Sequence, residues 1–144
     1  MATDRKAEVV WQGDLLHGSG TVQQVTSGAL GPLDVSWASR SEEPNGRTSP
    51  EELIAAAWAA CFSMALSHGL AQAGNAPEKL ETSATVTFQP GEGITRGVLT
   101  VRGTVPGIDE AAFRDAAEDA KQNCPVSKAL TGIPDVSIEA SLAS

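Results

Sequence analysis

The sequence predicts an α+β fold in which mostly antiparallel sheets surround one buried helix, and three observations lead to this prediction. Residues 50–73 form a long segment that is apolar on nearly every side and lies between helix start and stop signals. Six short segments have the β-branched content or the apolar–polar alternation of strands. The order is three strands, helix, two strands, two helices and one strand, which is typical of an α+β domain. At 144 residues without a linker or repeat, we expect a single domain over 1–144.

Three strands are expected before the long helix. Residues 7–12 and 20–26 are rich in β-branched side chains, and residues 33–38 alternate apolar with polar. Glycine and proline residues lie between these segments, where turns are needed. We therefore expect an antiparallel meander, followed by a polar surface loop over 39–48.

The central helix has clear signals at both ends. Ser49 is a candidate N-cap, Pro50 suits the first helical position, and Glu52 stands where a capping box requires an acidic residue. Gly74 supplies the stop. A soluble helix that is apolar on all sides is buried on all sides, so we expect sheets or a second subunit to enclose residues 50–73.

The second half of the chain continues with the same kinds of element. Asp109 is placed to cap a helix, and Pro125 suits the first position of a shorter one. The expected elements are strands over 80–89 and 94–105, a helix over 110–122, a short helix that begins at Cys124–Pro125, and a final strand over 135–142.

Composition and charge narrow the class of partner. The formal charge is −8, and the ten Lys and Arg residues are scattered, which argues against binding to nucleic acid or to an anionic membrane surface. Ser63, Ser67 and His68 interrupt the longest apolar segment, so no membrane span is expected. The N-terminus lacks the apolar core of a signal peptide. We expect a cytoplasmic protein, and in that reducing compartment two cysteines are redox-active or free rather than a permanent disulfide.

The two cysteines, Cys61 and Cys124, are the candidate nucleophiles. They stand 63 positions apart, so the logic of a local Cys-x-x-Cys motif does not apply. Cys61 lies amid alanine and leucine, where a free cysteine also serves as a small core residue. Cys124 stands at the start of a short helix, where unpaired N–H groups and the positive end of the helix dipole stabilise a thiolate. On this reasoning Cys124 is the more acidic thiol.

Metal and histidine chemistry fit the sequence poorly. His17 and His68 are the only other soft ligands, and no pair has the short spacing of a structural zinc site. His68 lies about 10 Å along the helix axis from Cys61, too far for a Cys–His dyad. What remains is a thiolate stabilised by arginine. The candidates are Arg40, Arg47, Arg96 and Arg102, although most surface arginines are only solvated charges. Arg40 and Arg47 lie in the loop that leads into the helix.

Two motifs carry a resemblance to a known family. The segments S-P-E-E-L-I-A-A-A-W-A-A-C-F-S-M-A-L-S over 49–67 and N-C-P-V-S-K-A-L over 123–130 resemble the OsmC/Ohr family, the osmotically inducible and organic hydroperoxide resistance proteins. The segments V-W-Q-G-D, G-S-G-T-V and V-P-G-I-D resemble its OsmC branch more than its Ohr branch. The resemblance covers nearly the whole chain.

The resemblance implies an OsmC-like fold and thiol peroxidase activity without metal, flavin, haem or any other cofactor. By this resemblance Cys61 is the peroxidatic cysteine, which attacks a hydroperoxide and becomes a sulfenic acid. Cys124 is the resolving cysteine, which condenses with it to a disulfide. Arg40 matches the arginine that holds the thiolate, and Glu51 matches the carboxylate that orients this arginine.

The resemblance also implies an intertwined homodimer with its active sites at the subunit interface, acting in oxidative and osmotic stress defence. Organic hydroperoxides are the implied substrates, with inorganic peroxide reduced less efficiently, and a dihydrolipoyl-type dithiol is the implied reductant. Trp58, Phe62 and Met64 would form an apolar substrate pocket. A straight helix would place Glu51 and Cys61 about 15 Å apart along its axis. We therefore expect either a break in the helix near Ala55–Ala57 or a site built from both chains.

Two other functions stay open at this point. One is a non-catalytic redox sensor or small-ligand binding protein on the same scaffold. The other is a structural dimer whose cysteines only fill the core. The two cysteines favour an enzyme over a binding protein, because binding alone requires neither.

Overall fold

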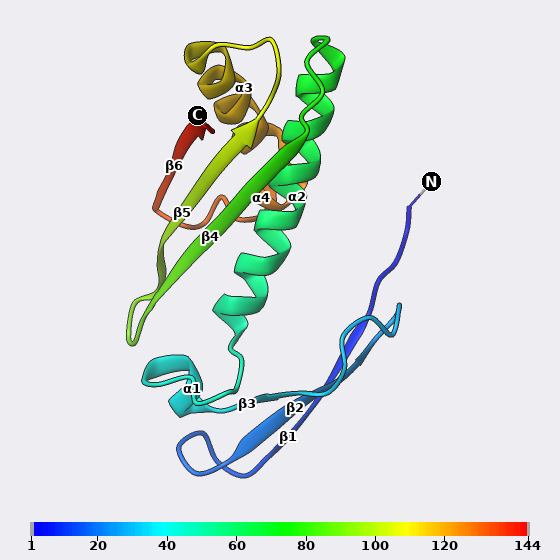
Figure 1. The fold of residues 1–144 in the computed structure, drawn as a ribbon. Helices are drawn as coiled ribbons and strands as arrows, with labels where there is room; N and C mark the ends of the chain where they lie inside the picture. Colours follow the sequence, from blue (N-terminus) through cyan, green and yellow to red (C-terminus); the bar gives the residue numbers. More distant parts are fainter. Residues whose placement is uncertain (1, 144) are drawn as a thin grey trace. The chain divides into compact units, whose positions relative to one another are not determined.

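The structure is a computed structural model that describes residues 2–143, and it has the α+β architecture that the sequence predicts (Figure 1). The chain divides into two compact units, one ending at Leu53 and the other beginning at Ile54. The single domain expected over 1–144 stays a prediction. The elements are β1 (Ala7–Gln12), β2 (Ser19–Val25), β3 (Leu33–Val35), α1 (Trp37–Ser41), α2 (Pro50–Gln72), β4 (Lys79–Gln89), β5 (Gly93–Thr104), α3 (Glu110–Asn123), α4 (Pro125–Ala129) and β6 (Asp135–Leu142).

The first unit is built on the expected antiparallel meander, with strands in the order β1-β2-β3. Gly20 of β2 pairs with Trp11 on one side and with Val35 on the other. A Cβ atom at Gly20 would lie 2.7 Å from a ring carbon of Trp11, closer than a real Cβ approaches. The glycine therefore allows the indole to lie against the middle strand.

The strand expected over 33–38 is wrong for its last three residues. β3 ends at Val35, and Ser36 caps the short helix α1 through a reciprocal capping box with Ser39. Each backbone N–H of this pair donates to the hydroxyl of the other residue at 3.0 Å. The Ser39 hydroxyl also donates to the Thr48 carbonyl oxygen at 2.8 Å. These local hydrogen bonds outweigh the alternation that predicted a strand.

The second unit contains a sheet in the order β4-β5-β6. The pairing of β4 with β5 is antiparallel, as expected, whereas β6 lies parallel to β5 with Ile138 opposite Leu99. Figure 1 shows β5 between the other two strands. The parallel pairing is possible because α3 and α4 form a crossover long enough to return the chain in the same direction. The expectation of mostly antiparallel sheets therefore holds with this one exception.

The helices of the second unit cover one face of this sheet. Leu99 and Val101 of β5 are fully buried and belong to one core cluster with Phe113 of α3 and residues of α2. Two glycines of β5 make room for the largest rings. A Cβ atom at Gly97 would lie 2.8 Å from the ring of Trp58, and one at Gly103 would lie 2.6 Å from the ring of Phe113.

Helix α2 is a continuous helix capped as the sequence predicts. The backbone N–H of Glu52 donates to the Ser49 hydroxyl at 3.2 Å. The carboxylate of Glu52 accepts a hydrogen bond from the Thr48 hydroxyl at 3.0 Å instead of closing the capping box. The helix runs from Pro50 to Gln72, so the break considered near residues 55–57 does not occur.

Within one chain, α2 is buried along one stripe only, which corrects the expectation of burial on all sides. The fully buried side chains follow each other at every fourth position: Trp58, Phe62, Leu66 and Leu70. In contrast, Met64 is 72% exposed. An apolar face of the helix therefore faces outward in the single chain.

By length and composition α2 is also apolar enough to cross a membrane, although polar residues interrupt its apolar segment. The core helix of a soluble protein passes the same test. The buried stripe of α2 makes it the core helix of the second unit.

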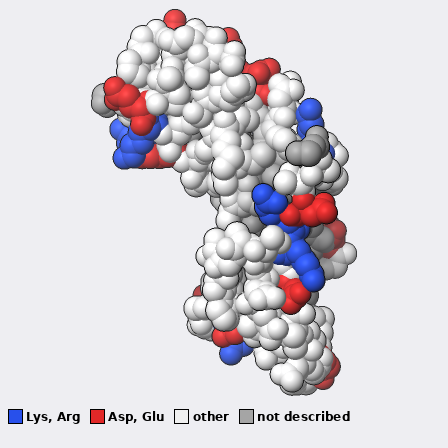
Figure 2. Space-filling model, turned by 90° about the vertical axis from the view of Figure 1, so that its right-hand side faces the viewer, with Lys and Arg blue, Asp and Glu red and all other residues white. Residues whose placement is uncertain are grey.

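On the face drawn in Figure 2, uncharged side chains dominate, and Lys and Arg form small groups beside Asp and Glu.

Candidate active site

The structure brings the two cysteines together. Cys61 lies in the middle of α2, and Cys124 occupies the position between α3 and α4. Both are free thiols, and Cys61 packs against the core cluster that contains Cys124. Their side chains lie within hydrogen-bonding reach of each other, and this contact raises the pKa of Cys61 and lowers the pKa of Cys124. Residues 63 positions apart thus form one dithiol pair.

Two helix ends fix the position of Cys124. Its backbone N–H donates to the Ala120 carbonyl oxygen at 2.9 Å, which closes the last turn of α3. Its own carbonyl oxygen accepts from the N–H of Lys128 at 3.1 Å, which opens α4. Pro125 occupies the first turn of α4, where it needs no backbone partner. Cys124 is therefore the C-cap of one helix and the N-cap of the next.

The environment of Cys61 favours its neutral form within the single chain. Burial raises the pKa of the Cys61 thiol, and its hydrogen bond to the Cys124 sulfur raises this pKa further. Both causes act because the thiolate loses hydration in the core and the thiol serves as a donor. A cation beside the Cys61 sulfur would oppose both effects and favour the thiolate.

The environment of Cys124 favours the thiolate. Burial opposes this by raising the pKa of Cys124, but the hydrogen bond from Cys61 and groups of α4 outweigh it and leave the pKa lowered. These groups are the backbone N–H and hydroxyl of Ser127 and the backbone N–H of Val126. The direction agrees with the sequence argument that a thiol at a helix start is the more acidic.

A buried tryptophan holds one of these groups. The Nε1–H of Trp58 donates to the Ser127 hydroxyl oxygen at 2.8 Å. Trp58 is completely buried, and Gly97 leaves the space that its ring occupies. Sequence reasoning missed Ser127, although it stands three residues after Cys124, at the spacing from which an N3 side chain reaches a capping residue.

Arg40 and Glu51 form a second pair, within the first unit. The guanidinium donates from Nε to the carboxylate at 3.0 Å and from Nη2 at 2.8 Å, which gives the two-pronged geometry of a strong ion pair. Glu51 is only 6% exposed, at the first turn of α2, and Arg40 is half-buried on α1. The carboxylate therefore holds the guanidinium in a fixed orientation.

The three residues expected to form a substrate pocket lie in different surroundings in the single chain. Trp58 lines a mostly apolar cavity of about 330 Å³, together with Ser127, Leu130 and Ile133. Met64 lines a different hollow, and Phe62 is completely buried in the core. A pocket shared by Trp58, Phe62 and Met64 stays a prediction.

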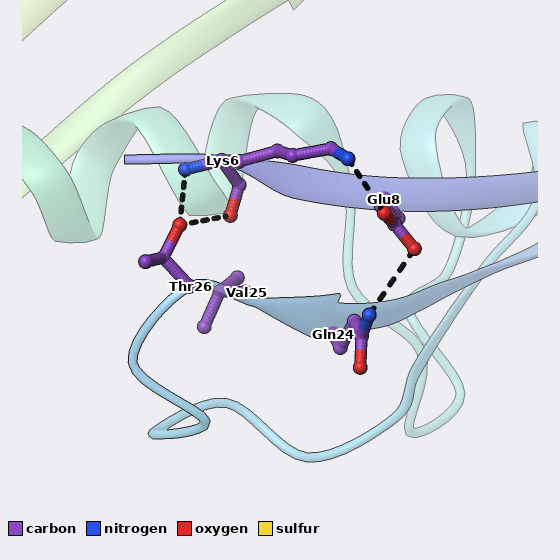
Figure 3. A pocket seen from close by; sticks show the side chains of 5 residues that line it. All are labelled: Lys6, Glu8, Gln24, Val25 and Thr26. Carbon is purple, nitrogen blue, oxygen red and sulfur yellow. Dashed lines mark hydrogen bonds and ion pairs between the residues drawn. The ribbon is translucent and has the colours of Figure 1, made fainter. Parts of the chain in front are cut away.

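The first unit carries another hollow, of about 250 Å³, between β1 and β2 (Figure 3). Lys6 pairs with Glu8 at 2.9 Å, and the Glu8 carboxylate also accepts from the Gln24 amide at 3.2 Å. Its polar groups thus bind one another, and none of its lining residues is a nucleophilic thiol. Within residues 2–143, no cluster of three His, Cys, Asp or Glu side chains is placed to hold a metal ion.

Comparison with known proteins identifies the family. The OsmC-like protein family matches residues 43–139. The chain belongs to the OsmC family. It is 42% identical over 133 residues to peroxiredoxin OsmC of Escherichia coli (strain K12), covering 90% of this chain and 92% of that protein. It is 33% identical over 110 residues to the organic hydroperoxide resistance protein OhrB of Bacillus subtilis (strain 168), covering 74% and 79% of the two chains.

The fold agrees with this membership. The crystal structure of OhrB from Bacillus subtilis superimposes with a TM-score of 0.64 at 25% identity, over 96% of this chain and 98% of that chain. The higher identity to OsmC than to the Ohr proteins places the chain nearer to the OsmC branch, as its motifs predict.

Proposed function

We propose that this OsmC-family chain is a thiol peroxidase that reduces organic hydroperoxides to alcohols. The observation that carries the proposal is the hydrogen-bonded pair of Cys61 and Cys124, because a peroxidase of this kind needs a second thiol within reach of the first. The relatives named peroxiredoxin OsmC and organic hydroperoxide resistance protein support it.

The proposed cycle uses only the two sulfurs and an external dithiol. The Cys61 thiolate attacks the terminal oxygen of the hydroperoxide, the O–O bond breaks, and the alkoxide takes a proton and leaves as the alcohol. The Cys124 thiolate then attacks the Cys61 sulfenic acid. An S–S bond forms, the S–O bond breaks, and hydroxide leaves as water after protonation. A dithiol reduces the disulfide and is itself oxidised to a disulfide.

Arg40 is the cation that we assign to the Cys61 thiolate, with Glu51 as the residue that orients it. Within one chain the pKa of Cys61 is raised, and a positive charge beside its sulfur would favour the attacking thiolate. The family resemblance implies active sites at a subunit interface, so we propose that the Arg40–Glu51 pair of one subunit serves the cysteine pair of its partner.

This arrangement requires a homodimer, and the outward apolar face of α2 around Met64 supports one. Light scattering on the purified protein is expected to give twice the 14.8 kDa mass of one chain. A Met64→Glu variant is expected to shift this mass toward the monomer and to lose activity with it. Full activity in a protein that stays monomeric would contradict the two-chain site.

The preferred substrates that we propose are organic hydroperoxides, with hydrogen peroxide reduced less efficiently, because the side chains expected at the pocket are apolar. A dihydrolipoyl-type dithiol is the proposed reductant, and defence against oxidative and osmotic stress in the cytoplasm is the proposed role. No bound cofactor enters the proposed chemistry.

The deciding experiment is an assay of the wild-type protein with cumene hydroperoxide and dihydrolipoamide. We expect catalytic consumption of the hydroperoxide and, after one equivalent without reductant, a Cys61–Cys124 disulfide in the peptide mass spectrum. An alternative is a non-catalytic redox sensor, which would use the same pair of free cysteines. A sensor would form the disulfide without turnover, and a protein that forms no disulfide at all would exclude both.

A further inference from the structure

Trp58 lines the mostly apolar cavity, and its hydrogen bond to Ser127 holds the Ser127 hydroxyl near the Cys124 sulfur. An indole N–H only donates, so the Ser127 oxygen is the acceptor in this 2.8 Å contact. With a lone pair of Ser127 engaged by Trp58, its own hydrogen is left to donate to another acceptor. The Ser127 hydroxyl and the backbone N–H groups of Val126 and Ser127 lie near enough to the Cys124 sulfur to lower its pKa.

The two cysteines also differ in solvent exposure. Cys124 is completely buried, whereas Cys61 is partly exposed on α2. An external thiol that attacks a disulfide between them reaches the Cys61 side more readily. In thiol–disulfide exchange, the attacked sulfur forms the new bond, and the other sulfur leaves as a thiolate.

We propose that Ser127, held by the indole of Trp58, is a positioning residue that stabilises Cys124 as the leaving thiolate when the Cys61–Cys124 disulfide is reduced. The regenerating dithiol therefore attacks Cys61. This inference rests on the proposed function, because it concerns the disulfide of that cycle. The structure holds both cysteines as free thiols, so the surroundings of Cys124 in it are those of the leaving sulfur.

One thiolate of the dithiol attacks the Cys61 sulfur, a mixed disulfide forms, and the bond to Cys124 breaks with its electron pair on Cys124. The Ser127 hydroxyl and the N–H groups of α4 stabilise this charge. The second thiolate of the dithiol then attacks the dithiol sulfur that is bonded to Cys61. The two dithiol sulfurs become joined to each other, and Cys61 is released as a thiolate. The dithiol is oxidised by two electrons, and the protein disulfide is reduced by two.

The first test measures the acidity of Cys124 directly. In a Cys61→Ser background, the ultraviolet absorbance of the thiolate against pH reports the pKa of Cys124 alone, without a reagent having to reach the buried sulfur. Ser127→Ala is expected to raise this pKa by about one unit, a tenfold loss of thiolate at lower pH. Trp58→Phe, which removes the indole N–H and keeps an aromatic ring, is expected to raise it by less.

Two control variants separate the hydroxyl from general packing effects. Ser127→Thr keeps the hydroxyl and is expected to keep the wild-type pKa. Thr131→Ala removes a different hydroxyl from the wall of the same cavity and is expected to leave the pKa unchanged. Thermal unfolding of each variant establishes that it is folded. An unchanged pKa of Cys124 in folded Ser127→Ala overturns the role of Ser127.

The second test finds the attacked sulfur. The protein is oxidised with diamide, treated briefly with 2-mercaptoethanol as a single-thiol probe, and then unfolded in guanidinium chloride that contains N-ethylmaleimide, so that the maleimide reaches buried thiols before peptide mass spectrometry. We expect mercaptoethanol on Cys61 and the maleimide on Cys124. The reverse labelling overturns the proposal. Diamide forms the disulfide without any hydroperoxide, so the labels on Cys61 and Cys124 can be measured even if the protein shows no peroxidase activity. Failure of this inference can therefore be distinguished from failure of the proposed function.

Discussion

Replacing Cys61 by serine is expected to lower the turnover of cumene hydroperoxide by roughly 10³-fold or more, as for the loss of other covalent nucleophiles. The hydroxyl of serine is close in size to the thiol but ionises far less readily, so the O–O bond meets no thiolate. The change is nearly isosteric at a partly exposed position of α2, and we expect the fold to be retained. Dithiol-coupled consumption of hydroperoxide measures the effect.

The matched variant is Cys124→Ser. It keeps the attacking thiol, so it is expected to form a sulfenic acid at Cys61 that dimedone traps in a single turnover, with no intramolecular disulfide. This comparison matters because Cys124 is the more acidic thiol of the pair within one chain. Trapping of a sulfenic acid on Cys124 in the Cys61→Ser variant, with none on Cys61 in Cys124→Ser, would mean that the two roles are exchanged.

Replacing Glu51 by glutamine is expected to lower turnover by about 10- to 100-fold, the usual range for a misplaced catalytic group. The neutral amide no longer holds the Arg40 guanidinium by two charge-assisted hydrogen bonds, so the cation loses its fixed orientation. The pKa of the Cys61 thiol in the assembled protein is expected to rise with the same change. Alkylation of Cys61 against pH in a Cys124→Ser background measures that rise.

Glu52→Gln is the control for this prediction, because Glu52 is the next residue of α2 and has an exposed side chain. Its carboxylate accepts one hydrogen bond from Thr48, which the glutamine amide oxygen also accepts. Its turnover is expected to stay within about twofold of wild type, since surface substitutions have small effects. Equal turnover in both variants would remove the Arg40–Glu51 pair from the site.

Local signals predicted most of the elements. Asp109 caps α3 through a hydrogen bond from the Ala112 N–H at 2.8 Å, as its position before an apolar segment predicts. The short helix α4 begins at Pro125, directly after Cys124. Such signals involve neighbours within about four residues, so they can be read from the sequence. The capping box of Ser36 and Ser39 is equally local, and it was missed because the alternation over 33–38 suggested a strand.

Contacts between residues far apart in the sequence could not be predicted from such local signals. The parallel pairing of β6 with β5 depends on how a crossover of two helices packs, which residue patterns do not specify. The hydrogen bond from Trp58 to Ser127 joins residues 69 positions apart, and the space for the indole comes from a glycine on a third element. Neither contact corresponds to a periodic pattern of residues in the sequence.

The sequence by itself predicted the α+β class, the two cysteines as the candidate reactive pair and the resemblance to the OsmC family, because motifs and helix caps are encoded by residues close together. Only the tertiary structure decided that Cys61 and Cys124 lie together, that the Trp58 indole donates to the Ser127 hydroxyl, and that Met64 of α2 faces outward. These follow from side chains of separate elements packing into one core, where burial and hydrogen-bond direction set the charge of each group.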